Sequence, residues 1–150
     1  MSFILKILSM FSLLLLGCNS QEKNIYIESP DKNISVKILQ RNNDFFYNVN
    51  FKGKTVIQDS KVGLIFKNNF EFPTNHNVKK VEKEFHKDTW ELPWGEKKIV
   101  KDIYNEIIIS LIDTDNLEAG KVLFRAYNDG IAFRYQMNDN NKNQDSLIII

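Results

Sequence analysis

Apolar and polar residues alternate along most of this chain, and this period of two restricts its fold more than any other feature. In the clearest example, Ile34, Val36 and Ile38 would share one face of an extended segment, with Ser35 and Lys37 on the other. Successive side chains of a strand point to opposite faces of a sheet, so the pattern is typical of a half-buried strand. Similar strand signals recur at residues 24–28, 45–51, 55–57, 62–66, 99–113, 122–126, 131–135 and 147–150.

Short polar turn signals separate these segments and indicate neighbouring antiparallel strands. Lys52-Gly53-Lys54 and Asn128-Asp129-Gly130 each join two alternating runs, as the turn of a hairpin does. Residues 78–86 fit both a helical and a strand spacing, and we favour a strand with a charged edge. A hydrophobic content of 43% is ample for the core of one domain. We therefore expect an all-β fold, a large antiparallel β-sandwich.

Both tryptophans of the chain lie in one short segment, at positions 90 and 94. Pro93 lacks the N–H group that a sheet ladder needs, and Gly95 permits backbone angles that other residues avoid. We therefore expect residues 88–96 to form neither a regular strand nor a helix. Large aromatic side chains on such a segment either anchor packing or meet a ligand, and physics alone leaves both interpretations open.

The first residues carry the features of an export signal. Lys6 supplies a basic start, and the apolar run 7–16 is too short to span a bilayer. A small residue precedes Cys18, the only cysteine, as in a bacterial lipobox; a plain secretory signal is the less favoured alternative. We expect residues 1–17 to be a lipoprotein signal peptide, Cys18 to be lipidated and residues 18–24 to be a tether. The protein would be exported and lipid-anchored, in the periplasm or at the outer membrane or cell surface, without disulfides.

The charge balance excludes some partners. The formal net charge is +1, and removal of the signal peptide would take away one basic residue, leaving basic and acidic residues equal in number. Such a chain offers no electrostatic argument for nucleic acid, and membrane contact is expected through the lipid only. The sequence stops in an apolar run at 147–150, which would expose a strand edge. We expect a truncated or split product of a longer gene.

Residue types that carry catalytic or metal chemistry are few and poorly spaced. His76 and His86 have no cysteine or second histidine at ligand spacing, so both are expected to be solvated surface residues. Two runs that begin at Asp113 and Asp139 depart from the ligand pattern of a calcium loop. No serine occupies a nucleophile-elbow motif, and no glycine-rich phosphate loop occurs. We expect no metal site in this chain.

Glycosidases hydrolyse with two carboxylates that lie about 5–10 Å apart. Three glutamates of this chain are candidates for such a pair. They are Glu91, Glu96 and Glu106. Acidic residues are common on any protein surface, so no catalytic residue is assigned. Arg125 and Arg134 are expected to pair with nearby carboxylates rather than to clamp a substrate.

Three runs of sequence, taken together, resemble one known family. They are Trp90-x-x-Pro93-Trp94-Gly95-Glu96, Tyr104-Asn105-Glu106 and Phe124-Arg125-Ala126-Tyr127-Asn128-Asp129-Gly130-Ile131-Ala132-Phe133-Arg134-Tyr135. In this order and at this spacing they resemble the amino-terminal domain of glycoside hydrolase family 97, which contains bacterial α-glucosidases and α-galactosidases. Residues 29–34 and 47–54 fit its first strands, so the resemblance covers most of residues 25–137.

The resemblance implies a super-sandwich of the galactose-mutarotase-like type over residues 25–150. In that family the acid, the base or nucleophile and most calcium ligands lie in a (β/α)8 barrel that follows this domain and is missing from this chain. The resemblance thus implies calcium for the full-length enzyme. For this chain it implies no cofactor and no independent activity. The glutamate that the family's amino-terminal domain lends to calcium is expected beyond residue 150.

The resemblance therefore implies an accessory, carbohydrate-binding domain, which packs on a barrel of the same or a split polypeptide and helps to shape an α-glycoside pocket. Trp90, Trp94 and Glu96 are the residues expected to contact sugar or barrel. Core or interdomain packing of the tryptophans is favoured over direct stacking on an α-linked glycan. The alternative function is a stand-alone lipid-anchored glycan-binding module or adhesin. A third interpretation is that the chain is a non-functional relic of a disrupted gene.

Overall fold

The computed structural model describes residues 22–67, 69–94, 98–138 and 147–148. Within these ranges the chain forms strands and turns without a helix, so no described segment could cross a membrane as a helix. All strand pairs are antiparallel. The strands are β1 Lys23–Glu28, β2 Ile34–Arg41, β3 Asp44–Phe51, β4 Lys54–Val62, β5 Leu64–Phe66, β6 Glu71–Phe72, β7 Asn77–Glu91, β8 Ile99–Ile112, β9 Glu118–Tyr127, β10 Ile131–Met137 and β11 Leu147–Ile148.

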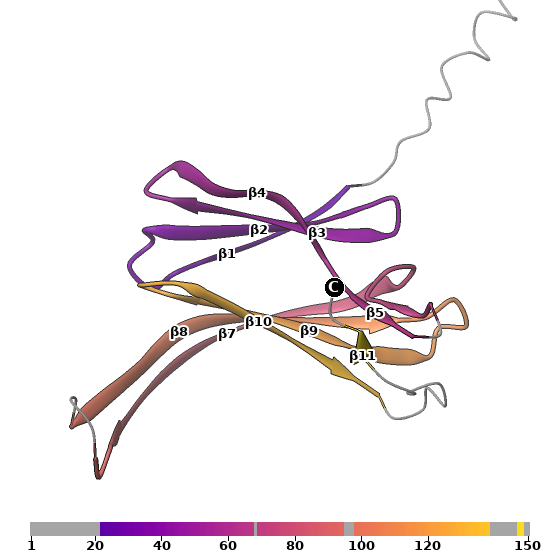
Figure 1. Cartoon of the computed structure of the whole chain (residues 1–150). Helices are drawn as coiled ribbons and strands as arrows, with labels where there is room; N and C mark the ends of the chain where they lie inside the picture. The colour runs from indigo at the N-terminus through magenta and orange to yellow at the C-terminus, as the bar shows by residue number, and fades with distance from the viewer. Residues whose placement is uncertain (1–21, 68, 95–97, 139–146, 149–150) are drawn as a thin grey trace, which may run out of the picture.

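Two four-stranded sheets face each other, as Figure 1 shows. The first has the order β1-β2-β3-β4 and the second the order β10-β9-β8-β7, while β11, β5 and β6 form a small third sheet. Each four-stranded sheet is a meander in which neighbours in sequence are neighbours in space. The all-β prediction and the antiparallel sandwich are confirmed.

Two tight turns of the first sheet explain its simple order. Asn42 and Asn43 join β2 to β3 with φ angles of 49° and 66°, and Lys52 and Gly53 join β3 to β4 with φ angles of 49° and 78°. Two consecutive residues in the left-handed region match the twist of antiparallel strands, and asparagine and glycine adopt that region at low cost. These turns set the register on either side of β3.

The core lies between the two large sheets and is built from the inward faces of alternating strands. Fully buried side chains from the first sheet meet those of the second, and Phe72 of β6, with 0% exposure, packs at one end. Removing such side chains from water contributes about 1.5–3 kcal/mol each. The principal members are Ile25, Ile27, Val36, Ile38, Val49, Ile107, Ile109, Leu111, Val122, Phe124 and Ala126.

The hairpin of β7 and β8 is longer than its neighbours and extends beyond them. β9 pairs with β8 as far as Tyr104 opposite Tyr127, whereas the β7–β8 ladder continues to Glu91 opposite Ile99. Lys87–Glu91 and Ile99–Ile103 therefore pair with each other and with no third described strand. This two-stranded ribbon, residues 87–94 and 98–103, is called the arm, and Figure 1 shows it projecting from the sandwich.

Two expectations about this hairpin had different outcomes. The segment 78–86, for which a strand was favoured over a helix, is part of strand β7. The expected irregularity of residues 88–96 is wrong for Asp88–Glu91, which pair with β8 residue by residue. Pro93 lies beyond the last pair, so its missing N–H group removes no ladder hydrogen bond. Asp88–Glu91 are extended because they pair with β8, whose β-branched residues are well suited to a strand.

Candidate functional site

The arm carries both tryptophans on an exposed ribbon. Trp90 lies opposite Val100 and is 44% exposed, and Trp94, in the turn, is 85% exposed. Leu92 is exposed as well and shares the face of Trp90, whereas the exposed Ile99 pairs with Glu91 and lies on the opposite face. A contiguous exposed apolar patch usually marks a contact site, and a two-stranded ribbon is only marginally stable by itself. A hollow of about 420 Å³ at the end of the arm is lined by Glu91, Leu92, Pro93, Trp94 and Lys98.

The interpretation of the two tryptophans as core residues is wrong. Trp90 lies on the same outward face of β7 as Glu84 and His86, and both tryptophans lie beyond the last pair of β8 with β9 and are exposed. The interpretations that remain for the two tryptophans are contact with another domain and contact with sugar. Glu96, the third residue expected in such a contact, lies outside the described residues, and its role stays a prediction.

Where the arm joins the sheet, a buried ion pair lies on the outer face. Ile107 and Phe124 point into the core, so their neighbours Glu106 and Arg125 point outward. These two residues are cross-strand partners, and Arg125 Nε donates to Glu106 Oε1 at 2.6 Å. The Glu106 side chain is 5% exposed and that of Arg125 is 30% exposed. The expected pairing of Arg125 with a carboxylate is confirmed.

Aromatic rings flank this pair and shape its electrostatics. Arg125 Cζ lies 4.4 Å from the ring centroid of the buried Tyr104, a cation–π contact. The hydrogen bond with Glu106 raises the pKa of Arg125 above its ordinary value, so the guanidinium group stays charged. Burial raises the pKa of the Tyr104 phenol, which therefore stays neutral at physiological pH.

The neighbouring strand β7 adds an imidazole and a second carboxylate. Glu84 lies opposite Glu106, and His86 lies opposite Tyr104 with its ring stacked on the phenol at 4.7 Å and 21°. His86 Nε2 is 3.2 Å from Glu84 Oε2 and 3.8 Å from Glu106 Oε2. Glu84, His86 and Glu106 are called the carboxylate–histidine cluster.

The expectation that both histidines are solvated surface residues is wrong for His76. This residue is 6% exposed, its Nδ1 lies 2.7 Å from the carbonyl oxygen of Thr74, and its ring packs 5.3 Å from that of Phe72. His86 is half-buried, with 37% of its side chain exposed. Sequence spacing could not find the cluster, since Glu106 reaches His86 through strand register and not through proximity in the chain.

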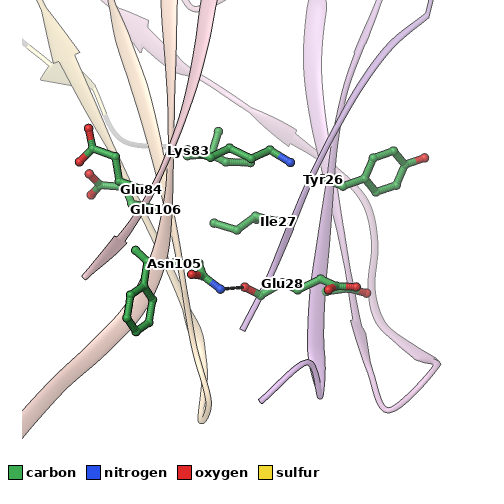
Figure 2. A pocket seen from close by; sticks show the side chains of 10 residues that line it. Tyr26, Ile27, Glu28, Lys83, Glu84, Asn105 and Glu106 are labelled. Atoms are coloured by element: carbon green, nitrogen blue, oxygen red, sulfur yellow. Dashed lines mark hydrogen bonds between the residues drawn. The ribbon is translucent and has the colours of Figure 1, made fainter. Parts of the chain in front are cut away.

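A cleft of about 660 Å³ lies between β1 of the first sheet and β7 and β8 of the second. Figure 2 shows that the Lys83 side chain reaches across it toward β1, and that Asn105 Nδ2 donates to the carbonyl oxygen of Glu28 at 2.7 Å. The carboxylates of Glu84 and Glu106 point away from β1 in the same view. The cleft thus presents an ammonium and an amide group between the sheets, without the paired carboxylates that glycoside hydrolysis needs.

Comparison with known families decides where the chain belongs. The sequence model of the family described as Glycosyl-hydrolase 97 N-terminal matches residues 27–150. The chain is a member of this family. The resemblance drawn from the tryptophan segment and the two later runs is confirmed, and the sandwich is that of a family 97 amino-terminal domain.

Solved structures show the same relationship. A glycoside hydrolase family 97 enzyme from Pseudoalteromonas sp. strain K8, solved with panose and with acarbose, is 32% identical with a TM-score of 0.68 in each case. Each match covers 75% of this chain and 17% of the enzyme, so the matched part of this chain spans less than a fifth of that protein. A β-arabinopyranosidase is 19% identical, with a TM-score of 0.66 and coverage of 75% of this chain and 18% of that one, and shares the fold.

Replacing Arg125 by methionine is expected to lower the free energy of unfolding by about 2–4 kcal/mol, because the buried Glu106 carboxylate loses its partner. The expected loss in free energy of unfolding is smaller than for a fully buried pair, because Arg125 is partly exposed. Urea denaturation followed by far-ultraviolet circular dichroism measures this. The double variant Arg125→Met, Glu106→Leu should recover most of the loss, since no charge is left buried.

The control is Arg134→Met, at an exposed position of the neighbouring strand β10, with an expected change within about 0.5 kcal/mol. Equal stability of the Arg125 and Arg134 variants would contradict the structural role of the pair.

Proposed function

We propose that this chain is an accessory domain of a family 97 α-glycosidase. It packs on a catalytic (β/α)8 barrel of the same or a split polypeptide and helps to shape the pocket for an α-linked glycan. The family match and the solved family 97 enzyme with bound panose or acarbose support this proposal, since 75% of this chain matches 17% of that enzyme. The comparisons give no support to the alternative of a stand-alone glycan-binding module.

The arm is the observation that carries the proposal. It exposes large apolar side chains on a ribbon that pairs with no third described strand, which is an unfavourable arrangement in water. Packing against a second domain would bury these side chains and support the ribbon at once. Aromatic anchors of this kind dominate the energetics of interfaces. Trp90 and Leu92 share one face of the ribbon and Trp94 follows them, whereas Ile99, the partner of Glu91, lies on the other face.

Catalysis is not proposed for this chain. Glu91 pairs with Ile99, seven positions along β8 from Glu106, and a strand rises about 3.3 Å per residue. The backbones at these glutamates are thus separated by about 23 Å, well beyond the 5–10 Å of a hydrolytic pair. Glu106 is also held by Arg125 and shielded from solvent. The catalytic carboxylates are proposed to lie in the barrel.

Calcium is likewise proposed to bind elsewhere in the full-length enzyme. Asp113 Oδ1 accepts hydrogen bonds from the backbone N–H groups of Asp115 and Leu117, so this carboxylate stabilises its own turn. The second calcium-loop-like run, from Asp139, lies outside the described residues. The Asp113 carboxylate is therefore engaged by its own backbone, and the calcium of the full-length enzyme is proposed to be held outside this turn.

The isolated chain is expected to leave 4-nitrophenyl α-glucoside unhydrolysed. A chimera in which residues 22–150 replace the matching segment of the Pseudoalteromonas enzyme should hydrolyse it. Trp94→Ala in the chimera should weaken packing of the arm by about 2 kcal/mol or more, as loss of an aromatic anchor does. The thermal midpoint and kcat/KM of the chimera would report this loss.

Phe51→Ala is the matched control, because Phe51 is as exposed as Trp90 but lies on β3 of the other sheet. Equal effects of Trp94→Ala and Phe51→Ala would contradict a docking role for the arm. Binding of panose by the isolated chain, lost in Trp94→Ala with the fold intact, would favour the stand-alone glycan-binding module instead.

We also propose that Cys18 is lipidated and anchors the exported protein. The support is the sequence alone, because residues 1–21 lie outside the described residues. Cys18→Ser is expected to move the protein from the membrane fraction to the soluble exported fraction, as seen by fractionation and immunoblotting. Ser20→Ala, in the tether, should leave the distribution unchanged. A Cys18→Ser variant that stays with the membrane would contradict the anchor.

A further inference from the structure

The carboxylate–histidine cluster brings three metal-ligating side chains to one point of the outer face. One ligand atom from each of Glu84, His86 and Glu106 lies within 4.8 Å of the other two. The register produces this convergence, since Glu84 and His86 are two apart on the same face of β7 and Glu106 is opposite Glu84. The pairing of β7 with β8 therefore holds the three side chains in position.

A second, independent observation concerns the imidazole nitrogen. His86 Nε2 has an accessible area below 1 Å² and makes no hydrogen bond within the described structure, although two carboxylate oxygens lie 3.2 Å and 3.8 Å away. A buried polar atom without a partner is rare and needs an explanation. A cation held between the nitrogen and the two oxygens would give that atom its partner.

We propose that Glu84, His86 and Glu106 bind a divalent transition-metal ion of the zinc type. Zinc accepts imidazole nitrogen at about 2.0–2.1 Å and carboxylate oxygen at about 2.0–2.2 Å, so ligand atoms around a tetrahedral ion stand about 3.3 Å apart. The separations of 3.2 Å and 3.8 Å are close to this value. Water would fill the remaining position. Calcium is disfavoured, because it selects oxygen ligands.

The surroundings of the cluster suit this role. Arg125 donates to Glu106 Oε1, which leaves Oε2 directed toward His86, and Tyr104 stacks on the imidazole ring. Such outer contacts fix the orientation of ligands. With a neutral imidazole, the two carboxylates and the guanidinium group sum to one negative charge, so a divalent cation is still attracted.

The competing explanation is that His86 is protonated and simply pairs with the two carboxylates. Zinc titration of the full chain, after removal of metal with a chelator, separates the two explanations. We expect one zinc ion per chain by calorimetry and a rise of about 5–10 °C in the thermal midpoint at saturation. Cobalt should bind at the same site and give visible absorption bands that zinc abolishes.

Two variants test the ligands. His86→Phe keeps an aromatic ring on Tyr104 and removes Nε2, and Glu84→Gln keeps the shape of the side chain. Each should weaken zinc binding at least about 100-fold, because loss of mere outer contacts already costs about 10–100-fold. The thermal midpoint of the metal-free protein should change little. Glu82→Gln, a carboxylate on the same strand that pairs with Lys80, is the matched control with unchanged binding.

The absence of saturable zinc binding would overturn the proposal and leave the ion pair as the explanation. Zinc binding that survives both His86→Phe and Glu84→Gln would overturn it as well. None of these measurements depends on glycosidase activity, so the outcome is independent of the proposed accessory role.

Discussion

The register of β7 against β8 is the constraint on which the rest of the structure depends. Side chains alternate with a period of two, so a shift of one residue would turn Glu84 and His86 toward the core and expose their apolar neighbours. The observed register keeps Ile107 and Ile109 inside and aligns Glu84, Glu106 and Arg125 outside. The β7–β8 ladder also continues past the last pair between β8 and β9, and this extension carries Trp90 on the arm.

The core and the ion pair contribute to this arrangement in different ways. Each fully buried aliphatic or aromatic side chain contributes about 1.5–3 kcal/mol, and the facing sheets bury many of them. A buried ion pair gives little net stability, because desolvation offsets most of the attraction. A shifted register of β8 against β9, however, would leave the Glu106 carboxylate buried without Arg125, which is strongly unfavourable. The core therefore stabilises the sandwich, whereas the ion pair selects the register of β8 against β9.

The sequence predicted local features well and long-range ones poorly. Alternation along β2 and the turn at Lys52-Gly53-Lys54 identify strands and hairpins, because both signals depend on neighbouring residues. The family was recognisable from the tryptophan segment and two later runs. The burial of His76 and the meeting of His86 with Glu106 depend on contacts between distant segments, which spacing does not reveal. The exposure of Trp94 follows from where β9 ends relative to β8, again a property of the register.

The most direct test of this account is measurement of cross-strand nuclear Overhauser contacts between β7, β8 and β9 in the isotope-labelled full chain. We predict backbone proton contacts that join Glu84 to Glu106, His86 to Tyr104 and Glu106 to Arg125, in the observed register. Contacts displaced by one residue, such as Phe85 to Glu106, would contradict it. In that register the carboxylate–histidine cluster would not form, and Trp90 would face the opposite side of the arm.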